Sequence, residues 1–484
     1  MKYTLEVAND SVVADLTILP INGGDFPQLA IDWDEDHGEI DAFLSSGDFL
    51  GKQGEVSWFP LGGKRLMFVG LGPQEDQNSR GIREAYAKAI AACQGKPWRH
   101  LMVALPDNGD AEAAAEAVQL RLYQFLEWKS NSKTEAFQTE KVTFLGAIDQ
   151  KLLDRISHRV MGVNWARDLV NRNANQVTPQ YLGAQAEALG ETSSRVTVDR
   201  FDKRWLKERG CGLLLAVGAG GDVPPEMIQI VYKGNPQSDK QLLLVGKGIT
   251  FDTGGLNLKP TNYIEDMRTD MGGAAAVMGA MRSLIAMDLP LNVVALIPTA
   301  ENAISSKSYK PGDVFSSFSG KTVEITNTDA EGRLILADAL AYGQATFQPT
   351  WTIDLATLTG AIVIALGEER IGFYANDETL AEACDRSGSQ SGEPVWRMPL
   401  DASYRKLLDS SIADIKNSAG RGGGSITAAK FLEEFIDSQR AWAHLDIAGT
   451  AHRDKPGGEH ATRATGSGVR FLLNLMESLA TNRG

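Results

Sequence analysis

Cysteine is scarce in this sequence: the 484 residues contain three, and they lie far apart along the chain. An odd, widely spaced set offers neither a disulfide framework nor the paired spacing of a zinc finger. Histidine is also scarce, with six residues and no H-E-x-x-H pair. Imidazole is therefore not expected to be the main ligand of any transition metal that the chain binds.

Long hydrophobic runs are missing as well. The most apolar windows, such as AIVIALG at 361–367, are far too short to span a bilayer. Residues 1–21 alternate apolar and polar side chains like a strand, and they lack the basic start and apolar block of a signal peptide. We therefore expect a cytoplasmic protein that has no membrane partner.

Positive charge is in deficit. The chain has 48 Lys and Arg against 62 Asp and Glu, a formal net charge of −14. Phosphate binding depends on Lys/Arg patches, so nucleic acid is not expected as a main partner. The remaining composition, 43% hydrophobic and 23% charged, is ordinary for a soluble globular protein. The length exceeds what one core usually supports, which favours two domains.

Strand and helix patterns alternate in the first 150 residues. The predicted strands are 64–72, 100–106 and 141–148, and the predicted helices are 80–96 and 110–128. A longer helical pattern covers 149–172, and we place the domain boundary in or around it. This run predicts an N-terminal α/β domain over 1–150 and a linking helix over 151–180.

The remainder, 181–484, is again α/β in pattern. The predicted strands are 241–248, 291–298, 321–327 and 350–357, and the predicted helices are 272–287 and 333–346.

Two short stretches in this part match the letters of known motifs but lack the sequence context that those motifs need. GSQSG at 388–392 matches the G-x-S-x-G elbow by its letters, but no apolar strand precedes it, and a polar loop is expected. GKT at 320–322 lacks the opening glycine of a P-loop, since position 315 is Phe.

NTDAEGRL at 327–334 permits two interpretations. Thr328 and Glu331 have the spacing of a capping box at the start of a helix. Asp329 and Glu331 could instead be oxygen ligands of a metal. Gly332 weakens the capping interpretation, because glycine in a first turn costs about 1 kcal/mol against alanine, and so something else requires a residue without a side chain there.

Two further stretches favour the metal. VGKGITFDTGGLNLKP at 245–260 leaves an apolar strand and carries Lys247, Asp252 and Lys259 among glycines. The ends of strands followed by glycine loops are where α/β sheets place ligand sites. EDMRTDMGGAA at 265–275 places Asp270 just before a glycine-alanine helix, where it could also be a plain N-cap. Several carboxylates beside glycines suggest oxygen ligands that converge on divalent cations.

Taken together, these stretches resemble the leucyl aminopeptidase family of cytosol aminopeptidases. Segments nearer the C-terminus, RMPL (397–400), DIKNSAGRGGGSITAAKFLEEF (414–435) and WAHLDIAGTA (442–451), resemble it too. The resemblance covers roughly 160–475. It implies a smaller N-terminal α/β domain and a larger catalytic α/β domain, whose mixed sheet is flanked by helices.

The resemblance also implies a set of site residues. Lys247, Asp252, Asp270, Asp329 and Glu331 would hold two divalent ions, Zn²⁺ or Mn²⁺, with Asp252 and Glu331 bridging them. A lysine ligand must be neutral, so its pKa would have to fall far below about 10.4. Lys259 and Arg333 would be the catalytic residues, with bicarbonate at Arg333. The implied substrate-binding residues are Met267, Asn327, Thr357, Leu358 and Gly360.

The implied reaction removes the N-terminal residue, leucine-like by preference, from peptide substrates by means of a water activated between two metals. The family also implies a homohexamer. Two other classes of function stay open at this point. One is a non-enzymatic role, as a DNA-binding factor or a scaffold, which the net charge and the filled site positions disfavour. The other is a carboxylate-metal phosphatase, which the lysine ligand disfavours.

Overall fold

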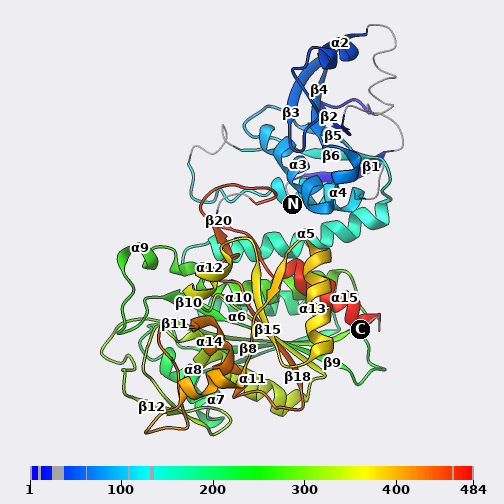
Figure 1. Ribbon diagram of the computed structural model, residues 1–484. Helices are drawn as coiled ribbons and strands as arrows, with labels where there is room; N and C mark the ends of the chain where they lie inside the picture. Colours follow the sequence, from blue (N-terminus) through cyan, green and yellow to red (C-terminus); the bar gives the residue numbers. More distant parts are fainter. Residues whose placement is uncertain are drawn as a thin grey trace. The chain divides into compact units, whose positions relative to one another are not determined.

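The computed structural model describes residues 3–8, 12–23, 38–61, 63–106, 110–130, 136–460 and 463–481. The chain divides into two compact units (Figure 1). The N-terminal unit comprises Met1–Met161 together with Asp454–Thr462, and the C-terminal unit comprises Gly162–Arg453 with Arg463–Gly484. The chain therefore enters each unit twice. The division falls inside one long helix, α5 (Gln150–Asn171).

The N-terminal unit is built on a six-stranded sheet of order β1-β6-β5-β2-β4-β3. Neighbouring strands are parallel except β3 and β4, which are antiparallel. The central strands are buried on both faces, as expected of a parallel sheet covered by helices. The strands are β1 (Thr4–Ala8), β2 (Leu16–Ile21), β3 (Val56–Leu61), β4 (Lys64–Gly70), β5 (His100–Ala104) and β6 (Lys141–Leu145).

Among the described residues, the helices of this unit are α2 (Glu39–Ser45), α3 (Ser79–Ala92), α4 (Ala111–Arg121) and the first part of α5, with a short 3₁₀ turn, η1 (Gln74–Asp76). The helix predicted over 110–128 is too long, because α4 ends at Arg121. Its last turn tightens where Tyr123 N donates to Leu120 O at 3.4 Å, and the Gln124 side chain turns away to accept from Phe137 N at 3.0 Å.

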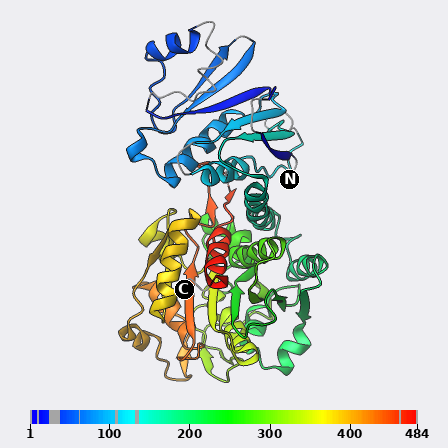
Figure 2. The ribbon, with the colours of Figure 1, turned by 90° about the vertical axis from the view of Figure 1, so that its right-hand side faces the viewer.

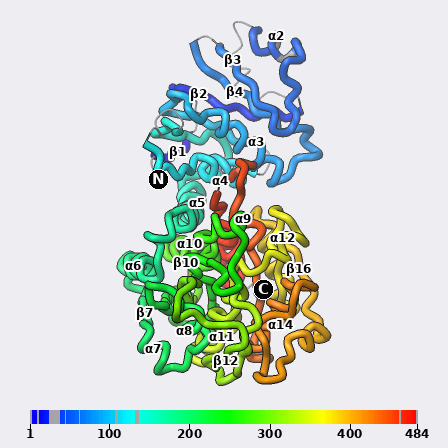
Figure 3. The backbone as a smooth tube through the Cα atoms, turned by 90° about the vertical axis from the view of Figure 1, so that its left-hand side faces the viewer, coloured from blue at the N-terminus to red at the C-terminus, as the bar shows by residue number. Residues whose placement is uncertain are grey.

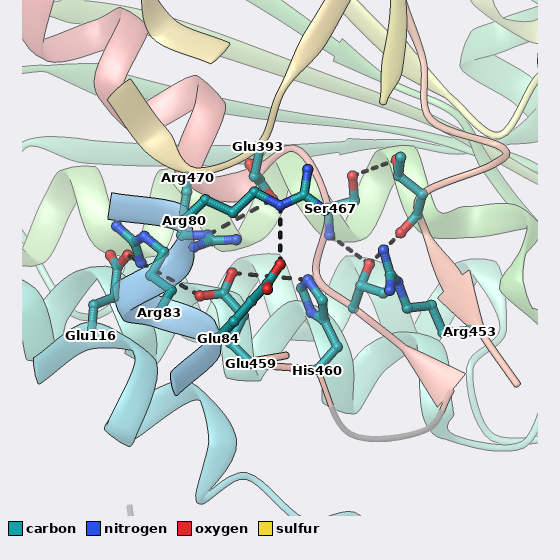
Figure 4. A network of polar contacts seen from close by, with 12 residues as sticks. Arg80, Arg83, Glu84, Glu116, Glu393, Arg453, Glu459, His460, Ser467 and Arg470 are labelled. Atoms are coloured by element: carbon teal, nitrogen blue, oxygen red, sulfur yellow. Dashed lines mark hydrogen bonds and ion pairs between the residues drawn. The ribbon is translucent and has the colours of Figure 1, made fainter. Parts of the chain in front are cut away.

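A buried ion cluster joins the segment Asp454–Thr462 to the rest of the N-terminal unit. Figure 4 shows Arg83 of α3 between Glu116 of α4 and Glu459 of that segment. The Arg83 Nη1 to Glu459 Oε2 distance is 3.5 Å, and the Glu116 side chain is fully buried. Arg159 of α5 adds a second positive charge at Glu116, with its Nη1 3.1 Å from Glu116 Oε1. Buried charges are tolerated only when paired in this way.

The C-terminal unit contains a nine-stranded mixed sheet of order β16-β15-β18-β14-β9-β11-β8-β7, with β10 added beside β11. Strands β18, β14, β9, β11 and β10 run parallel, so their carboxyl ends lie at one edge. The strands are β7 (Val196–Phe201), β8 (Glu226–Lys233), β9 (Gln241–Gly246), β10 (Gly248–Asp252), β11 (Asn292–Asn302), β14 (Trp351–Ala356), β15 (Ile371–Ala375), β16 (Val395–Arg397) and β18 (Ala441–Asp446).

Helices cover both faces of this sheet. α10 (Gly272–Ala286), α13 (Glu378–Ser391) and α15 (Val469–Ala480) pack together on one face, and Figure 2 shows the red α15 beside α13. α8 (Gly212–Val217), α11 (Gly332–Phe347) and α14 (Gly424–Glu433) cover the other. Alternation along β9 explains the division, because Leu243 faces α11 whereas Gly246 lies against α10. The prediction of two α/β domains with a mixed sheet flanked by helices is confirmed.

The shorter elements of this unit lie around the large sheet. They are α6 (Pro179–Gly190), α7 (Lys203–Glu208), α9 (Thr261–Ile264) and α12 (Gly360–Leu366); the 3₁₀ turns η3 (Met267–Met271) and η4 (Ala402–Leu408); a small sheet of β12 (Val314–Ser316), β13 (Thr322–Glu324) and β17 (Ile415–Lys416); and a hairpin of β19 (His452–Arg453) and β20 (Arg463–Ala464). Figure 3 shows α9, β10 and α12 in the C-terminal unit.

Two local predictions in this unit are wrong. The strand predicted over 321–327 ends at Glu324, because the N–H groups of Thr326 and Asn327 bond to the Asn417 side chain instead of a neighbouring strand. The polar loop predicted at 388–392 is the last turn of α13, which Gly392 closes in the left-handed conformation at φ 74°. A helix that could cross a membrane is not found among the described residues.

Candidate functional site

The candidate site lies where the parallel strands of the C-terminal unit end. Lys247 directly follows β9, Asp252 closes β10, and Thr357 follows β14. The backbone ties two of these ends together, since Lys247 N donates to Leu355 O at 3.0 Å. The carboxyl edge of an α/β sheet is the usual place for a ligand, because the strands deliver side chains there from several directions.

Two lysines and four carboxylates converge at this edge. Lys247 Nζ lies 2.7 Å from Asp270 Oδ1 and 2.9 Å from Glu331 Oε1. Lys259 Nζ lies 2.9 Å from Asp252 Oδ2 and 2.6 Å from Asp329 Oδ1. Asp252, Asp329 and Glu331 each have one carboxylate oxygen that lies within 4.8 Å of the corresponding oxygens of the other two. This spacing could hold a metal ion.

Most of the cluster is buried, whereas the Asp329 side chain is 33% exposed, and the negative charge of the cluster exceeds its positive charge. Burial raises the pKa of Asp252 to about 6, and the neighbouring Glu331 adds to that rise. Burial also raises the pKa of Asp270 well above its ordinary value. Burial alone would lower the pKa of Lys247, but the charges of Asp270 and Glu331 raise it. Four acids against two ammonium groups leave a deficit of positive charge that divalent cations would supply.

Two buried oxygens of the cluster fit this need. Asp270 Oδ2 and Glu331 Oε2 are buried and accept no hydrogen bond from any described residue. A buried carboxylate oxygen without a partner is costly, and a cation at that place removes the cost. The donor set, carboxylate oxygens with one amine, is of the kind that binds divalent metals once the amine is neutral.

The structure explains why position 332 requires a residue without a side chain. A Cβ at this position would lie 2.5 Å from Lys247 Cε and 2.7 Å from Lys247 Nζ. Glycine therefore lets the lysine pass against the start of α11 and reach the carboxylates.

The two helix-cap interpretations are wrong. The N-cap of α11 is Glu331, whose side chain makes no capping bond. Thr328 does not cap the helix; its hydroxyl donates to Gly254 O at 2.7 Å and accepts from Asn257 N at 2.9 Å. Asp270 lies inside η3, and the N-cap of α10 is Met271. The polar side chains are therefore directed into the cluster or its supports.

The predicted substrate-binding residues differ in how directly they contact the cluster. Thr357 touches it, because its hydroxyl donates to Asp270 Oδ1 at 2.8 Å and its carbonyl accepts from Lys247 Nζ at 2.9 Å. Asn327 accepts from Asp329 N at 2.9 Å. Met267 begins η3, which carries Asp270. Leu358 is partly buried, and Gly360 is exposed with open space at its Cβ position.

Arg333 is the second residue of α11, directly after Gly332, and its side chain is buried. Its Nη1 donates to Asn417 O at 2.8 Å, while its Nε has no described hydrogen-bond partner. Burial lowers the pKa of Arg333 to about 10, and the guanidinium still carries its charge at neutral pH. An arginine held in this way can bind a small anion.

Several supporting residues were not predicted. Asn302 Nδ2 donates to Asp252 Oδ1 at 2.8 Å and to Thr328 O at 3.0 Å, and Tyr309 Oη donates to Thr328 O at 2.7 Å. Asp446 accepts from Leu358 N at 3.1 Å and from the Thr359 hydroxyl at 2.6 Å. Asn302 and Asp446 each end a strand, as Asp252 does, and a polar residue at the end of an apolar strand is the sequence signal that could have found them.

This fold and site define an α/β enzyme whose polar cluster lies at the carboxyl edge of a mixed sheet. Two family models match the chain: the catalytic domain of the cytosol aminopeptidase family over residues 164–473, and the N-terminal domain of that family over residues 20–132. The chain belongs to the cytosol aminopeptidase family, and it is a peptidase.

Curated relatives and solved structures agree. A probable cytosol aminopeptidase of Protochlamydia amoebophila (strain UWE25) is 40% identical over 96% of both chains. One of Chlamydia abortus (strain DSM 27085 / S26/3) is 42% identical over 89% of both. The bottromycin maturation enzyme BotP in complex with Mn has a TM-score of 0.87 at 33% identity, covering 97% of this chain and 100% of BotP. A mutant of tomato leucine aminopeptidase has a TM-score of 0.88 at 34% identity, covering 98% of this chain and 96% of that one.

Proposed function

We propose that this chain is a metal-dependent aminopeptidase that removes the N-terminal residue, leucine-like by preference, from peptides. The observation that carries the proposal is the largely buried cluster of four carboxylates and two lysines at one sheet edge, with Asp270 Oδ2 and Glu331 Oε2 lacking partners among the described residues. Family membership and the manganese in the BotP structure support it.

The proposed metal ligands are Lys247, Asp252, Asp270, Asp329 and Glu331. Two divalent ions held there, Zn²⁺ or Mn²⁺, would supply a water of lowered pKa and bind the amine and carbonyl of the substrate. Exopeptidase specificity would follow, because an internal peptide bond has no free amine beside it. The substrate would lie along Met267, Asn327, Thr357, Leu358 and Gly360.

The charged side chains would act on the reacting groups. The Lys259 ammonium, which its neighbouring carboxylates keep protonated, would donate to the oxygen that becomes negative as the scissile carbonyl is attacked. Preorganised donors of this kind contribute about 3–4 kcal/mol. Arg333, with its free Nε, would hold bicarbonate, and the proton of the water would pass to the leaving amine by way of that anion.

Other parts of the proposal rest on the relatives alone. The C-terminal unit would be the catalytic domain, and α5 the helix that links it to the N-terminal domain. A cytoplasmic location, which the name of the family suggests, belongs to the same proposal, and a homohexamer is proposed from the resemblance in sequence.

The test compares the variants Asp329→Asn and Glu331→Gln with the control Asp409→Asn. Asp409 follows η4, and its exposed side chain pairs with Arg405 at 2.8 Å instead of joining the cluster. Chelated protein is reloaded with Mn²⁺ or Zn²⁺, and hydrolysis of leucine p-nitroanilide and metal per chain are measured. We expect the first two variants to lose at least about 100-fold in kcat/KM, as when a ligand is removed, and the control to keep its activity. Near-normal hydrolysis by Asp329→Asn or Glu331→Gln would refute the ligand assignment.

A further inference from the structure

Asn417 follows β17 and is fully buried. β17 pairs with β13 in parallel, and the pairing ends where Asn417 N donates to Glu324 O at 3.0 Å. Beyond that point the β13 chain leaves the sheet and runs toward Asp329. The side chain of Asn417 takes over the hydrogen bonds that a continuing strand would have made.

Both ends of the Asn417 amide bind the backbone on either side of Asp329. Its Oδ1 accepts from Thr326 N at 2.8 Å and from Asn327 N at 3.2 Å. Its Nδ2 donates to Asn327 O at 2.7 Å and to Ala330 O at 3.4 Å. The bonds therefore reach the chain on both sides of Asp329, at Asn327 and at Ala330.

The main chain of Asn417 reaches a second site residue. Its carbonyl accepts from Arg333 Nη1 at 2.8 Å, and Arg333 Nε has no described partner. One residue thus touches the loop that bears Asp329 and also the guanidinium on the first turn of α11. Since both contacts come from a single buried position, a shift of Asn417 would move a metal-ligand candidate and a catalytic candidate together.

We propose that Asn417 is a positioning residue of the site, which sets the Thr326–Ala330 loop so that Asp329 faces the carboxylate cluster and which aims the Arg333 guanidinium. The loop geometry stands by itself, while the consequence for catalysis rests on the proposed function. Partners that orient a metal ligand without touching the metal are typically worth 10- to 100-fold in metal affinity or in activity.

A matched control exists at the edge of the nine-stranded sheet that lies opposite its carboxyl edge. Asn292 begins β11, and its amide also spans a loop: its Oδ1 accepts from Asn235 N at 3.0 Å, and its Nδ2 donates to Asn235 O and to Ser238 O, both at 2.8 Å. Asn292→Ala removes a comparable set of bonds far from the carboxyl edge. It reports what the loss of such an amide does to folding alone.

The experiment uses the full chain with Asn417→Ala, Asn417→Asp and Asn292→Ala. Mn²⁺ is titrated into chelated protein by calorimetry, leucine p-nitroanilide hydrolysis gives kcat and KM, and Tm is recorded without metal. We expect Asn417→Ala to weaken the weaker-binding Mn²⁺ and to lower kcat, each by about 10- to 100-fold, with KM within about threefold. Asn417→Asp keeps the shape and the acceptor, but it places a carboxylate oxygen against Asn327 O and Ala330 O, so an equal or larger loss is expected even if the alanine variant does not fold.

The outcomes separate the two claims. Asn292→Ala should keep both Mn²⁺ affinities and kcat within about twofold, whatever its Tm. The inference is overturned if the Asn417→Ala variant keeps both Mn²⁺ affinities and kcat within about twofold whatever its Tm, as Asn292→Ala should, or if Asn417→Asp matches the wild type. A wild-type chain that binds two Mn²⁺ but hydrolyses no peptide would refute the proposed function, and the Mn²⁺ affinities of the variants would still decide the role of Asn417.

Discussion

Gly332 and Lys247 lie so close that there is room between them for little more than a hydrogen atom. The Cβ of an alanine at 332 would meet Lys247 Cε at 2.5 Å, which forces the lysine away from Asp270 and Glu331. The same substitution favours the helix by about 1 kcal/mol. The two effects have opposite signs, so the site can fail while the helix gains.

We expect Gly332→Ala to lower kcat/KM by at least tenfold and to reduce bound metal per chain, with Tm of the metal-free protein unchanged or higher. Leucine p-nitroanilide hydrolysis, metal analysis and thermal unfolding measure the three. Gly422→Ala is the control, since open space surrounds its Cβ position. Full activity and full metal content in Gly332→Ala would contradict the steric argument.

At the scale of single residues, the sequence predicted which side chains come together. Lys247, Asp252, Asp270, Asp329 and Glu331 were proposed as one cluster, and the structure brings them together. The supports Asn302, Asn417 and Asp446 were not predicted. An amide or carboxylate that binds the backbone of a distant loop has no local pattern, because its partners lie tens of residues away in sequence.

At the scale of elements, α11 carries a buried acid on the face opposite to water. Asp338 is fully buried and accepts from Leu214 N at 2.9 Å and from Phe318 N at 2.8 Å. It thus joins α11 to α8 and to the loop after β12. Burial raises the pKa of Asp338 to about 7, although the backbone hydrogen bonds oppose the rise.

A pH dependence of stability follows from this raised pKa. The folded state binds the proton of Asp338 more tightly than the unfolded chain, in which the pKa is about 3.8. The stabilisation is therefore fully present below about pH 4 and is lost as the pH rises toward 7, by about 4 kcal/mol in all.

Asp338→Asn removes this titration. We expect its urea midpoint to fall less than that of the wild type between pH 4.5 and pH 7.5, because asparagine carries no charge at either pH. Circular dichroism during urea unfolding measures the midpoints of the two proteins at both pH values. Parallel pH profiles for the two chains would contradict the raised pKa.

Elements with strong periodicity were predicted well, and their ends were not. The helix expected at 333–346 is observed as α11, Gly332–Phe347, and the strand expected at 350–357 as β14, Trp351–Ala356. The strand predicted at 321–327 ended early, because a side chain from Asn417 competed for its N–H groups. Such competition depends on tertiary structure, and periodicity does not contain it.

At the scale of the whole molecule, metal binding and folding should be coupled. Asp252, Asp270 and Glu331 are buried with incomplete charge compensation, and the unfolded chain has no preformed site. A ligand that binds only the folded state adds about 2.7 kcal/mol at a concentration one hundred times its Kd. We expect chelation to lower Tm and Mn²⁺ to restore it in a concentration-dependent way.

Differential scanning calorimetry of chelated and reloaded protein measures this shift. In Glu331→Gln the Tm gain on adding Mn²⁺ should shrink, whereas in Asp409→Asn it should match that of the wild type. A Tm indifferent to both chelator and metal would mean that the carboxylates find their compensation within the chain itself.

The return of the chain to the N-terminal unit at Asp454–Thr462 has a consequence for biosynthesis. Arg83 and Glu116 leave the ribosome early, but Glu459 follows about 340 residues later, roughly 20 to 70 s at ordinary rates of translation. During that interval the nascent domain lacks part of its own interior. The first unit to be translated is thus among the last to be completed, and a ribosome that stalls in the second half leaves both halves unfinished.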